Sequence, residues 1–451
     1  MGKRKPSKKR RLRILWGSDQ PTRPTGYGVV SREMVKRLVE RGHEVFVMGW
    51  DFNGEDFPHP EGWTMVHAGI GSFGCDETNG PRSPRTIDVN LARIKPDVYF
   101  SLIDPWLIGP MSDACIKANV PHIAYLPIDG FPVSRAWIQQ LRAVHTPLWM
   151  SHFGASEFES FVNRWESAGS GPEHLRDPFI DRYVGQPREV LYHGVDLDVF
   201  KPVSREQKMA WREALGIGHW STVFLSVGRN TNRKQQPRLL HAFKRMLSEH
   251  PDPDSVGLVM HVGDPTNLMG MGGWDLPWMI QDLDLSRNVT FSDTSTNPLH
   301  GLPREDMARL FAMADAHVLA TGGEGFGVPS AEAMACGIPI ILPDNSTGPE
   351  LVGAKAGVKK VTNGDHGLLV PCAADIVGPK WGVTMRLIDV DALAEALLRM
   401  TIDVETREAM GAAARTFAEK HFDWEAITDQ AEALMLKKAD EPHALGMNTV
   451  I

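Results

Sequence analysis

The stretch 324–344, EGFGVPSAEAMACGIPIILPD, decides the fold. It reads as a loop with an acid and two glycines, then a short helix, then a buried strand. Gly325 and Gly327 let backbone N–H groups approach a ligand closely, and the helix N-terminus beyond them favours negative charge. Glu324 and Glu332, with seven residues between them, offer carboxylates that accept hydrogen bonds from hydroxyls. The segment therefore predicts a site for a diphosphate flanked by hydroxyl-rich rings, such as a nucleotide-sugar.

This block resembles the E-x7-E signature of the retaining glycosyltransferases of family 4 (glycosyl transferases group 1), which have the GT-B fold. The acid, the glycines, Pro329, the second acid and the small-residue helix end fall in register. The resemblance implies that Glu332 binds the ribose hydroxyls and Glu324 the donor sugar. It also implies that loop residues help to bind the donor: Gly325, Phe326, Gly327 and Val328. The alternative is an ordinary loop-to-helix junction with solvated acids.

A pattern of strand, loop, helix and strand occurs twice, which predicts two Rossmann-like doubly wound α/β domains facing a cleft. In the first half we expect a strand at 12–18, a glycine-containing loop at 19–28, a helix at 29–41 and a strand at 43–50. In the second half the expected elements are a strand, a helix and a strand: 222–228, 237–250 and 257–262. Segments 51–85 and 167–187 are predicted to be loop-heavy or irregular, because they are rich in Gly, Pro and polar residues.

These patterns divide the chain into four parts. They are a basic disordered tail (1–11), an N-terminal acceptor domain (12–202), a C-terminal nucleotide-sugar donor domain (203–420) and a C-terminal segment (421–451). The domain boundary falls at 193–202, HGVDLDVFKP, which has turn residues followed by a proline. The resemblance implies that a helix of the last segment crosses back to the first domain.

A basic loop follows the first strand of the second half, in VGRNTNRK at 227–234. Ligands of open α/β sheets bind at the carboxyl ends of the strands, so Gly228, Arg229 and Lys234 should lie at the cleft. The family uses an Arg and a Lys at this spacing to hold the donor diphosphate and stabilise the leaving group. Arg233 is the rival for either role, and an exposed basic loop is the alternative interpretation.

Two first-domain loops give weaker signals. Gly26 and Gly28, in TGYG, stand where the family has its glycine loop against donor phosphate or acceptor, although a structural turn explains them equally well. In YLPIDG, at 125–130, Asp129 is a candidate for contact with the donor sugar or for accepting a proton. Ile128 takes the place of the histidine found in many family members. Three histidines are alternatives for its role: His122, His145 and His152.

Metal and cofactor motifs are weak. D-x-D occurs four times, but none follows a convincing core strand, so we expect no metal and no cofactor. No G-x-G-x-x-G follows the first strand, which argues against a dinucleotide-dependent oxidoreductase.

Composition supports a globular protein with an uneven distribution of charge. Of 451 residues, 42% are hydrophobic, no apolar run reaches the length of a membrane span, and the four cysteines form no C-x-x-C pair. We therefore expect a reduced, cytoplasmic protein. Eight of the 48 basic residues lie in the first thirteen positions, which leaves 40 against 56 acidic ones in the body. The tail is either a solvated arm or a peripheral contact to anionic membrane or nucleic acid.

Together these observations predict a retaining, metal-independent glycosyltransferase. Its partners would be a nucleotide-sugar donor and a glycan, lipid-linked or other hydroxyl acceptor. We favour front-face attack over a covalent glycosyl-enzyme, because no acid is obviously placed as the nucleophile. A nucleotide-sugar epimerase or a disaccharide phosphorylase of the same fold is the alternative function.

Overall fold

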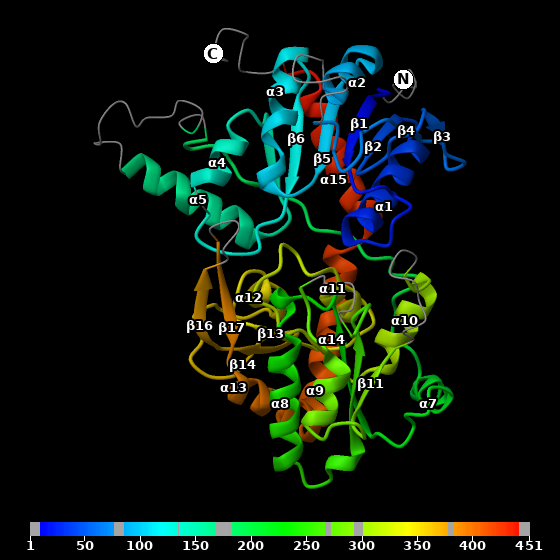
Figure 1. Cartoon of the computed structure of the whole chain (residues 1–451), viewed down its shortest axis with the longest axis vertical. Helices are drawn as coiled ribbons and strands as arrows, with labels where there is room; N and C mark the ends of the chain where they lie inside the picture. The colour runs from blue at the N-terminus through cyan, green and yellow to red at the C-terminus, as the bar shows by residue number, and fades with distance from the viewer. Residues whose placement is uncertain are drawn as a thin grey trace, which may run out of the picture.

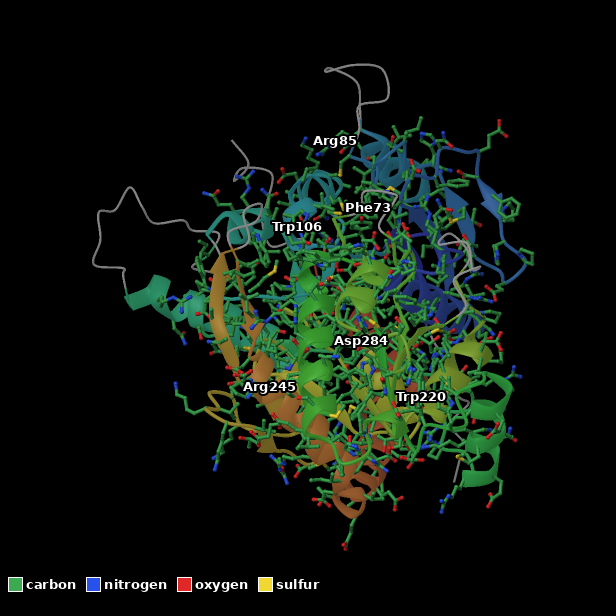
Figure 2. The ribbon with its side chains drawn as sticks, turned by 60° about the horizontal axis from the view of Figure 1, so that its bottom comes forward. Phe73, Arg85, Trp106, Trp220, Arg245 and Asp284 are labelled. Carbon is green, nitrogen blue, oxygen red and sulfur yellow. The ribbon has the colours of Figure 1, made fainter. Side chains whose placement is uncertain are left out.

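The computed structural model describes residues 10–75, 85–133, 135–167, 180, 183–266, 272–292, 301–377 and 383–441. Two α/β domains lie one above the other in Figure 1, with the N-terminal domain at the top. Each contains a mostly parallel sheet covered by helices, which confirms the predicted pair of doubly wound domains. Phe73 and Trp106 lie in the first domain, whereas Trp220, Arg245 and Asp284 lie in the second (Figure 2).

The sheet of the first domain has eight strands in the order β3-β4-β2-β1-β5-β6-β7-β8. Neighbouring strands are parallel except β3 and β4. β5 and β6 are buried along their whole length, as expected for parallel strands covered on both faces. The strands are β1 (Arg13–Ser18), β2 (Glu44–Gly49), β3 (Phe57–Pro58), β4 (Thr64–Val66), β5 (Val98–Leu102), β6 (His122–Leu126), β7 (Thr146–Trp149) and β8 (Glu189–Val190).

The helices of this domain connect its parallel strands. They are α1 (Gly26–Glu40), α2 (Thr86–Ile94), η1 (Pro105–Leu107), α3 (Gly109–Ala118), α4 (Arg135–Leu141) and α5 (His152–Ser167). α1 begins where the Thr25 side chain accepts a hydrogen bond from the Gly28 N–H, a typical N-cap. It ends before Gly42, whose φ of 92° reverses the chain into β2.

The sheet of the second domain has seven strands in the order β11-β10-β9-β12-β13-β15-β14, and a separate hairpin pairs β16 with β17. Its strands are β9 (Thr222–Val227), β10 (Val256–His261), β11 (Val289–Phe291), β12 (Ala316–Val318), β13 (Ile340–Pro343), β14 (Thr362–Asn363), β15 (Gly367–Val370), β16 (Cys372–Val377) and β17 (Thr384–Ile388). Its helices are α7 (Arg205–Ala214), η3 (Asn232–Lys234), α8 (Gln236–Glu249), η4 (Pro253–Ser255), α9 (Leu276–Asp282), α10 (Arg304–Met313), α11 (Val328–Ala335), α12 (Gly348–Val352), α13 (Val390–Ile402) and α14 (Val404–His421).

Two regions contain strands that the sequence did not predict. Segment 51–85 is loop-heavy over its described residues, as expected, but it also supplies β3 and β4 at the edge of the first sheet, and residues 76–84 lie outside the described residues. These strands are only two and three residues long, too short for a clear periodic pattern. The β16–β17 hairpin was not anticipated either. Most of segment 167–187 and the tail 1–9 lie outside the described residues.

The last helix, α15 (Trp424–Lys438), packs on α1 of the first domain (Figure 1). Arg37 of α1 binds Glu425 at 2.8 Å, and His43 at the start of β2 lies 2.9 Å from Glu432. Trp424, Ile427 and Met435 are buried in the same hydrophobic cluster as residues of α1 and β1. The chain therefore crosses between the domains twice.

No helix in the described part of the chain is both long and apolar enough to span a membrane.

Candidate functional site

The site forms where three neighbouring strands of the second sheet end. The basic loop follows β9, the acid-glycine loop follows β12, and residues 344–347 follow β13. Because these strands are parallel neighbours, their carboxyl ends bring the three loops together at the edge that faces the first domain. The sequence therefore places its candidate residues at one end of one sheet.

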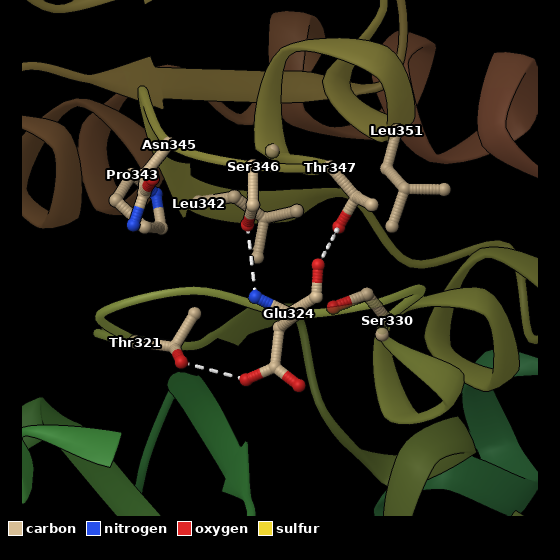
Figure 3. Close-up of a pocket in the computed structure, with 11 residues that line it drawn as sticks. Thr321, Glu324, Ser330, Leu342, Pro343, Asn345, Ser346, Thr347 and Leu351 are labelled. Carbon is tan, nitrogen blue, oxygen red and sulfur yellow. Dashed lines mark hydrogen bonds between the residues drawn. The ribbon is translucent and has the colours of Figure 1, made fainter. Parts of the chain in front are cut away.

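Glu324 is the centre of this arrangement (Figure 3). Its backbone N–H donates to Ser346 Oγ at 2.8 Å, and Thr321 Oγ1 donates to its Oε1 at 2.6 Å. Thr347 Oγ1 donates to the Phe326 carbonyl at 3.0 Å. Hydroxyls from two adjacent loops thus fix both the backbone and the carboxylate of the turn before α11.

Two cations contact the Glu324 carboxylate. Its Oε1 lies 2.7 Å from Lys234 Nζ and 3.0 Å from Arg233 Nη1. Burial alone would raise the pKa of Glu324, but Arg233 and Lys234 outweigh burial and hold that pKa at about 2. Burial also lowers the pKa of Lys234, while Glu324 opposes that change. The acid and Lys234, both predicted from sequence, are therefore direct neighbours.

Arg229 is placed differently from Arg233. Its side chain is exposed and forms no ion pair within the described residues, while its carbonyl accepts a hydrogen bond from Gln236. Arg233 also donates to the Gly323 carbonyl, so it spans the acid-glycine loop. In this conformation the arginine beside Glu324 is Arg233, which the sequence analysis gave as the alternative to Arg229. The role implied for Arg229 stays a prediction.

The first domain approaches this loop very closely. A Cβ on Gly323 would clash with the Asp129 carbonyl oxygen, and one on Gly325 would lie 2.5 Å from Pro127 Cβ. Both positions need glycine for this reason. Asp129 Oδ2 lies 4.0 Å from Arg233 Nε of the second domain. Burial raises the pKa of Asp129, and Arg233 opposes the rise.

Two first-domain residues that sequence reasoning missed extend the site. Tyr27, within TGYG, donates from its hydroxyl to Asp104 Oδ1 at 2.8 Å. Burial raises the pKa of Asp104 to about 6. Asp104 follows the buried strand β5 just as Asp129 follows β6, and this shared position was the signal available in the sequence.

The glycines of the TGYG loop have different surroundings. A Cβ on Gly28 would clash with the Arg23 carbonyl, whereas no atom lies within 4 Å of a Cβ on Gly26. Gly28 therefore serves close packing at the start of α1. Gly228, at the end of β9, would bring a Cβ within 3.3 Å of the Lys234 side chain.

Glu332 lies on α11, the helix that follows the acid-glycine loop. Burial raises the pKa of its carboxyl to about 7, and Arg304 is the cation that opposes the rise. A carboxyl whose pKa is raised by burial is a candidate for ligand recognition.

The histidine alternatives have ordinary structural surroundings. His122 is fully buried between the hydroxyls of Ser101 and Ser112, at 2.8 and 2.9 Å. His152 begins α5 and is exposed. Ile128, which stands in place of the usual histidine, is 1% exposed. His145, the third alternative, has its Nδ1 2.8 Å from Thr146 Oγ1 at the start of β7.

The β16–β17 hairpin joins the two domains next to Asp129. Phe131 and Thr384 exchange two backbone hydrogen bonds, at 2.8 and 3.2 Å. The Arg386 guanidinium lies 4.5 Å from the centre of the Phe131 ring, and Val383 is buried in a first-domain hydrophobic cluster. Closure of the cleft is thus stabilised by backbone pairing, a cation–π contact and apolar burial.

Glu350 forms another link between the domains. Its carboxylate accepts hydrogen bonds from the N–H groups of His152 and Phe153 at the start of α5. It also accepts one from the Tyr192 hydroxyl at 2.5 Å. Glu350 therefore caps the N-terminus of α5 and braces it against the second domain.

No group of three or more His, Cys, Asp or Glu side chains in the described ranges is arranged to hold a metal ion.

Comparison with known proteins identifies a match to one domain family and several similar proteins. Residues 207–377 match the family described as Glycosyl transferases group 1. The chain is 28% identical over 249 residues to a GDP-mannose-dependent phosphatidylinositol monomannoside mannosyltransferase of Corynebacterium glutamicum, covering 54% of each chain. It is 31% identical over 268 residues to a D-inositol 3-phosphate glycosyltransferase of Kribbella flavida, covering 59% of this chain and 54% of the relative. These matches span about half the length of the relatives.

The fold is similar over nearly the whole chain to that of solved proteins. The Anabaena protein HepE in complex with UDP-glucose matches with a TM-score of 0.63 and 18% identity, covering 94% of this chain and 99% of that chain. The architecture is therefore of the GT-B type.

Proposed function

We propose that this chain is a retaining, metal-independent glycosyltransferase that moves a sugar from a nucleotide diphosphate donor to an acceptor hydroxyl. The observation that carries the proposal is the Glu324 carboxylate held by Lys234 and Arg233 where the strands of the second domain end. The group 1 domain over residues 207–377 and the glycosyltransferases named among similar proteins support it.

The donor would lie on the second domain. Lys234 and Arg233 are positioned to pair with the diphosphate, and the N-terminus of α11 beyond Gly327 adds backbone N–H groups. Exposed Arg229 is available at the rim to a larger anionic ligand. These positive groups neutralise the charge that develops on the leaving phosphate, which is the task that a metal ion performs elsewhere.

Glu324 would accept hydrogen bonds from donor-sugar hydroxyls. Its pKa of about 2 keeps it ionised at neutral pH, so its oxygens act only as acceptors. Lys234 would then lie between the sugar-binding acid and the diphosphate. Glu332, farther along α11, would bind the ribose hydroxyls.

Retention would follow from attack on the face that the phosphate leaves. The acceptor oxygen bonds to the anomeric carbon as the bond from that carbon to the phosphate oxygen breaks. The electron pair stays on the phosphate oxygen, which takes the acceptor proton. Glu324 is a weak nucleophile, because two cations and Thr321 stabilise its negative charge. This favours front-face attack over a covalent glycosyl-enzyme.

The acceptor would approach from the first domain. The side chains on this side include the Asp129 carboxylate and the linked Tyr27 and Asp104 pair. The mannosyltransferase and inositol-phosphate enzymes named above act on hydroxyl-rich acceptors, one of them lipid-linked. We therefore propose a glycan, lipid-linked or other polyhydroxyl acceptor. No observation favours the epimerase or phosphorylase alternative.

A donor screen tests the proposal. The full chain should be stabilised against thermal unfolding by one or more nucleotide-sugars, and that donor should be consumed faster when acceptors are added. Lys234→Met should reduce kcat/KM by about 100-fold or more, because it removes a positive charge from the leaving group. Arg245→Met, on the exposed part of α8, is the matched control.

Two results would contradict the proposal. One is a Lys234→Met variant as active as the Arg245→Met control. The other is loss of sugar transfer on addition of a chelator such as EDTA. That result would contradict the proposed metal independence but not the proposed binding of the donor.

A further inference from the structure

Two segments of the chain cross between the domains, and they are paired with each other. The outward crossing follows β8 in the first domain, and the return crossing joins α14 to α15 (Figure 1). They are residues 191–195 and residues 421–424, respectively. The Val195 N–H donates to the Phe422 carbonyl at 2.7 Å. A Cβ on Gly194 would clash with the Trp424 ring, so the two crossings are in close contact.

The Phe326 ring of the acid-glycine loop packs against both crossings. Its centre lies 4.8 Å from that of the His193 ring and 5.7 Å from that of the Tyr192 ring, both in the outward crossing. It lies 5.6 Å from the Phe422 ring of the return crossing. Phe326 is 3% exposed. Its ring therefore belongs to the hydrophobic core around the crossings, and a donor would contact Phe326 through its backbone.

Phe326 is also tied closely to the rest of the site. It lies two residues after Glu324, and its carbonyl accepts a hydrogen bond from Thr347 Oγ1 at 3.0 Å. Between Glu324 and Phe326, Gly325 lies against the first domain, because a Cβ there would be 2.5 Å from Pro127 Cβ. A displacement of the Phe326 ring would therefore reach Glu324 through one intervening residue.

His193 connects the outward crossing to the first domain. Its Nδ1 lies 2.8 Å from the hydroxyl oxygen of Tyr125, and the two rings meet edge to face with their centres 5.2 Å apart. The Tyr125 hydroxyl, at the end of β6, also donates to the Leu191 carbonyl at 2.8 Å. A carbonyl oxygen can only accept, so the one hydroxyl proton of Tyr125 goes to Leu191. The Tyr125 oxygen then accepts from His193, which places the imidazole proton on Nδ1.

This arrangement gives His193 a fixed orientation and no charge. The residue is 3% exposed, and burial lowers its pKa to about 3, so the ring is neutral at physiological pH. The hydrogen bond to Tyr125 fixes the ring on one side, and the edge-to-face contact with Phe326 fixes it on the other. One imidazole therefore stands between the first domain and the acid-glycine loop of the second.

We propose that His193 is a positioning residue that orients the acid-glycine loop, and with it the Glu324 carboxylate, when the two domains are together. The link runs from the Tyr125 hydroxyl through the His193 ring to the Phe326 ring. Its kinetic consequence rests on the proposed function, because it takes Glu324 to act on the donor during sugar transfer. The link itself can be measured without any substrate.

The physical basis is directional packing in a dense interior. Hydrogen bonds and edge-to-face ring contacts both have preferred geometries, and a core with few voids transmits displacements. Loss of one member of the link leaves the loop a wider range of positions. Lys234 and Arg233 lie outside the link, so donor binding should largely survive. Sugar transfer should not, because misplacement of a reacting group by about 1 Å can lower a rate by about 100-fold.

Hydrogen–deuterium exchange of the ligand-free full chain tests the link. His193→Leu and Phe326→Leu should each speed exchange of the amides at 324–330 by several-fold, because the loop loses a packing partner. Phe243→Leu is the matched control, since Phe243 on α8 is fully buried in a different hydrophobic cluster. Unchanged exchange at 324–330 in His193→Leu overturns the inference, and so does an equal increase in the control.

Steady-state kinetics give a second readout. His193→Leu should lower kcat on the order of tenfold and change the donor KM by less than about threefold, because the cations that would bind the diphosphate are untouched. Tyr125→Phe should lower kcat by a smaller factor. Its matched control is Tyr183→Phe, which removes a buried hydroxyl that donates to the Leu141 carbonyl at 2.8 Å in the same domain. Melting curves check that each variant is folded.

A double-mutant cycle separates the link from general destabilisation. The losses of kcat in Tyr125→Phe and Phe326→Leu should be non-additive in the wild-type background and additive in the His193→Leu background. Additive losses in both backgrounds would overturn the role of His193, because a merely structural residue predicts that result. If the wild-type chain transfers sugar from no nucleotide-sugar, the proposed function fails, whereas the exchange experiment still decides whether His193 positions the loop.

Discussion

Lys234 Nζ lies 2.7 Å from Glu324 Oε1, so the cation proposed for the donor diphosphate contacts the acid proposed for the donor sugar. They come from loops after different strands, 90 residues apart in the chain. A donor would therefore enter a site whose charges are already paired. Its diphosphate would become a second anionic partner of Lys234 beside Glu324, and no free ammonium group would have to be desolvated.

The two arginines of the basic loop should behave differently. Arg233→Met removes one of the two cations on Glu324, so the pKa of Glu324 should rise and kcat/KM should fall by about 10- to 100-fold. Arg229→Met leaves that pair intact and should mainly raise the donor KM, if Arg229 reaches the diphosphate as the resemblance implies. Steady-state kinetics of both variants would decide between them. Equal losses in kcat would contradict the distinction.

The stability of the protein should depend on Glu324 at acidic pH. The folded-state pKa of about 2 lies below the ordinary value of 4.5, so the stabilisation is fully present above about pH 4.5 and is lost as pH falls toward 2. Glu324→Gln should therefore flatten the decline of the free energy of unfolding over this window. Urea titrations at several acidic pH values measure it, and an unchanged slope would argue against the buried ion pair.

Glu332 should act on stability in the opposite direction. Its pKa of about 7 is raised, so the folded state binds this proton more tightly and loses stability as pH rises from about 4.5 through 7. Glu332→Gln should stabilise the protein above pH 7 by about 1–2 kcal/mol while weakening donor binding. Thermal melting at pH 6 and pH 8 tests this, since a benefit that is equal at both values would rule out titration of Glu332.

The hairpin contact should control how readily the cleft closes. Val383 is 2% exposed and packs in a first-domain cluster, so Val383→Ser should weaken closure and raise the donor KM several-fold. Val404→Ser, at a position 45% exposed on α14, is the matched control. Small-angle scattering should show a larger radius of gyration for Val383→Ser alone. Identical scattering from both variants would contradict the role of the hairpin.

The basic tail remains a separate prediction. Deleting residues 1–11 should abolish any binding to vesicles containing anionic lipid and leave donor binding unchanged, because the positive charge is concentrated there. Sedimentation with anionic and neutral vesicles measures the first, and gel shift with DNA tests the competing ligand. If the full chain binds neither, the tail is a solvated arm.

Much of the fold was readable because its strands are continuous apolar runs between loop signals. Thr222–Val227 is an example, since every residue in it is buried. Glu324, Lys234 and Asp129 were readable for a related reason, because each lies in or next to a loop after such a strand.

The features that could not be predicted from the sequence depend on distances between segments that are far apart in the chain. Choosing Arg233 over Arg229 requires knowing which way the turn at Asn232–Lys234 directs each side chain. Asp104 and Tyr27 lie 77 residues apart and become a pair only in the folded sheet. The hairpin at Cys372–Ile388 is recognisable as an interdomain contact only once Phe131 is opposite Thr384.

The return of α15 to the first domain has a consequence for biogenesis. Trp424, Ile427 and Met435 fill part of the core around α1 and β1, yet they are synthesised after the entire second domain. When synthesis has reached residue 202, the nascent chain still lacks the side chains that complete this core. The first domain therefore cannot finish folding before the second, which reverses the usual N-terminal-first order. The second domain should complete its folding first on the ribosome, and the first should become protease-resistant only when translation has passed Lys438.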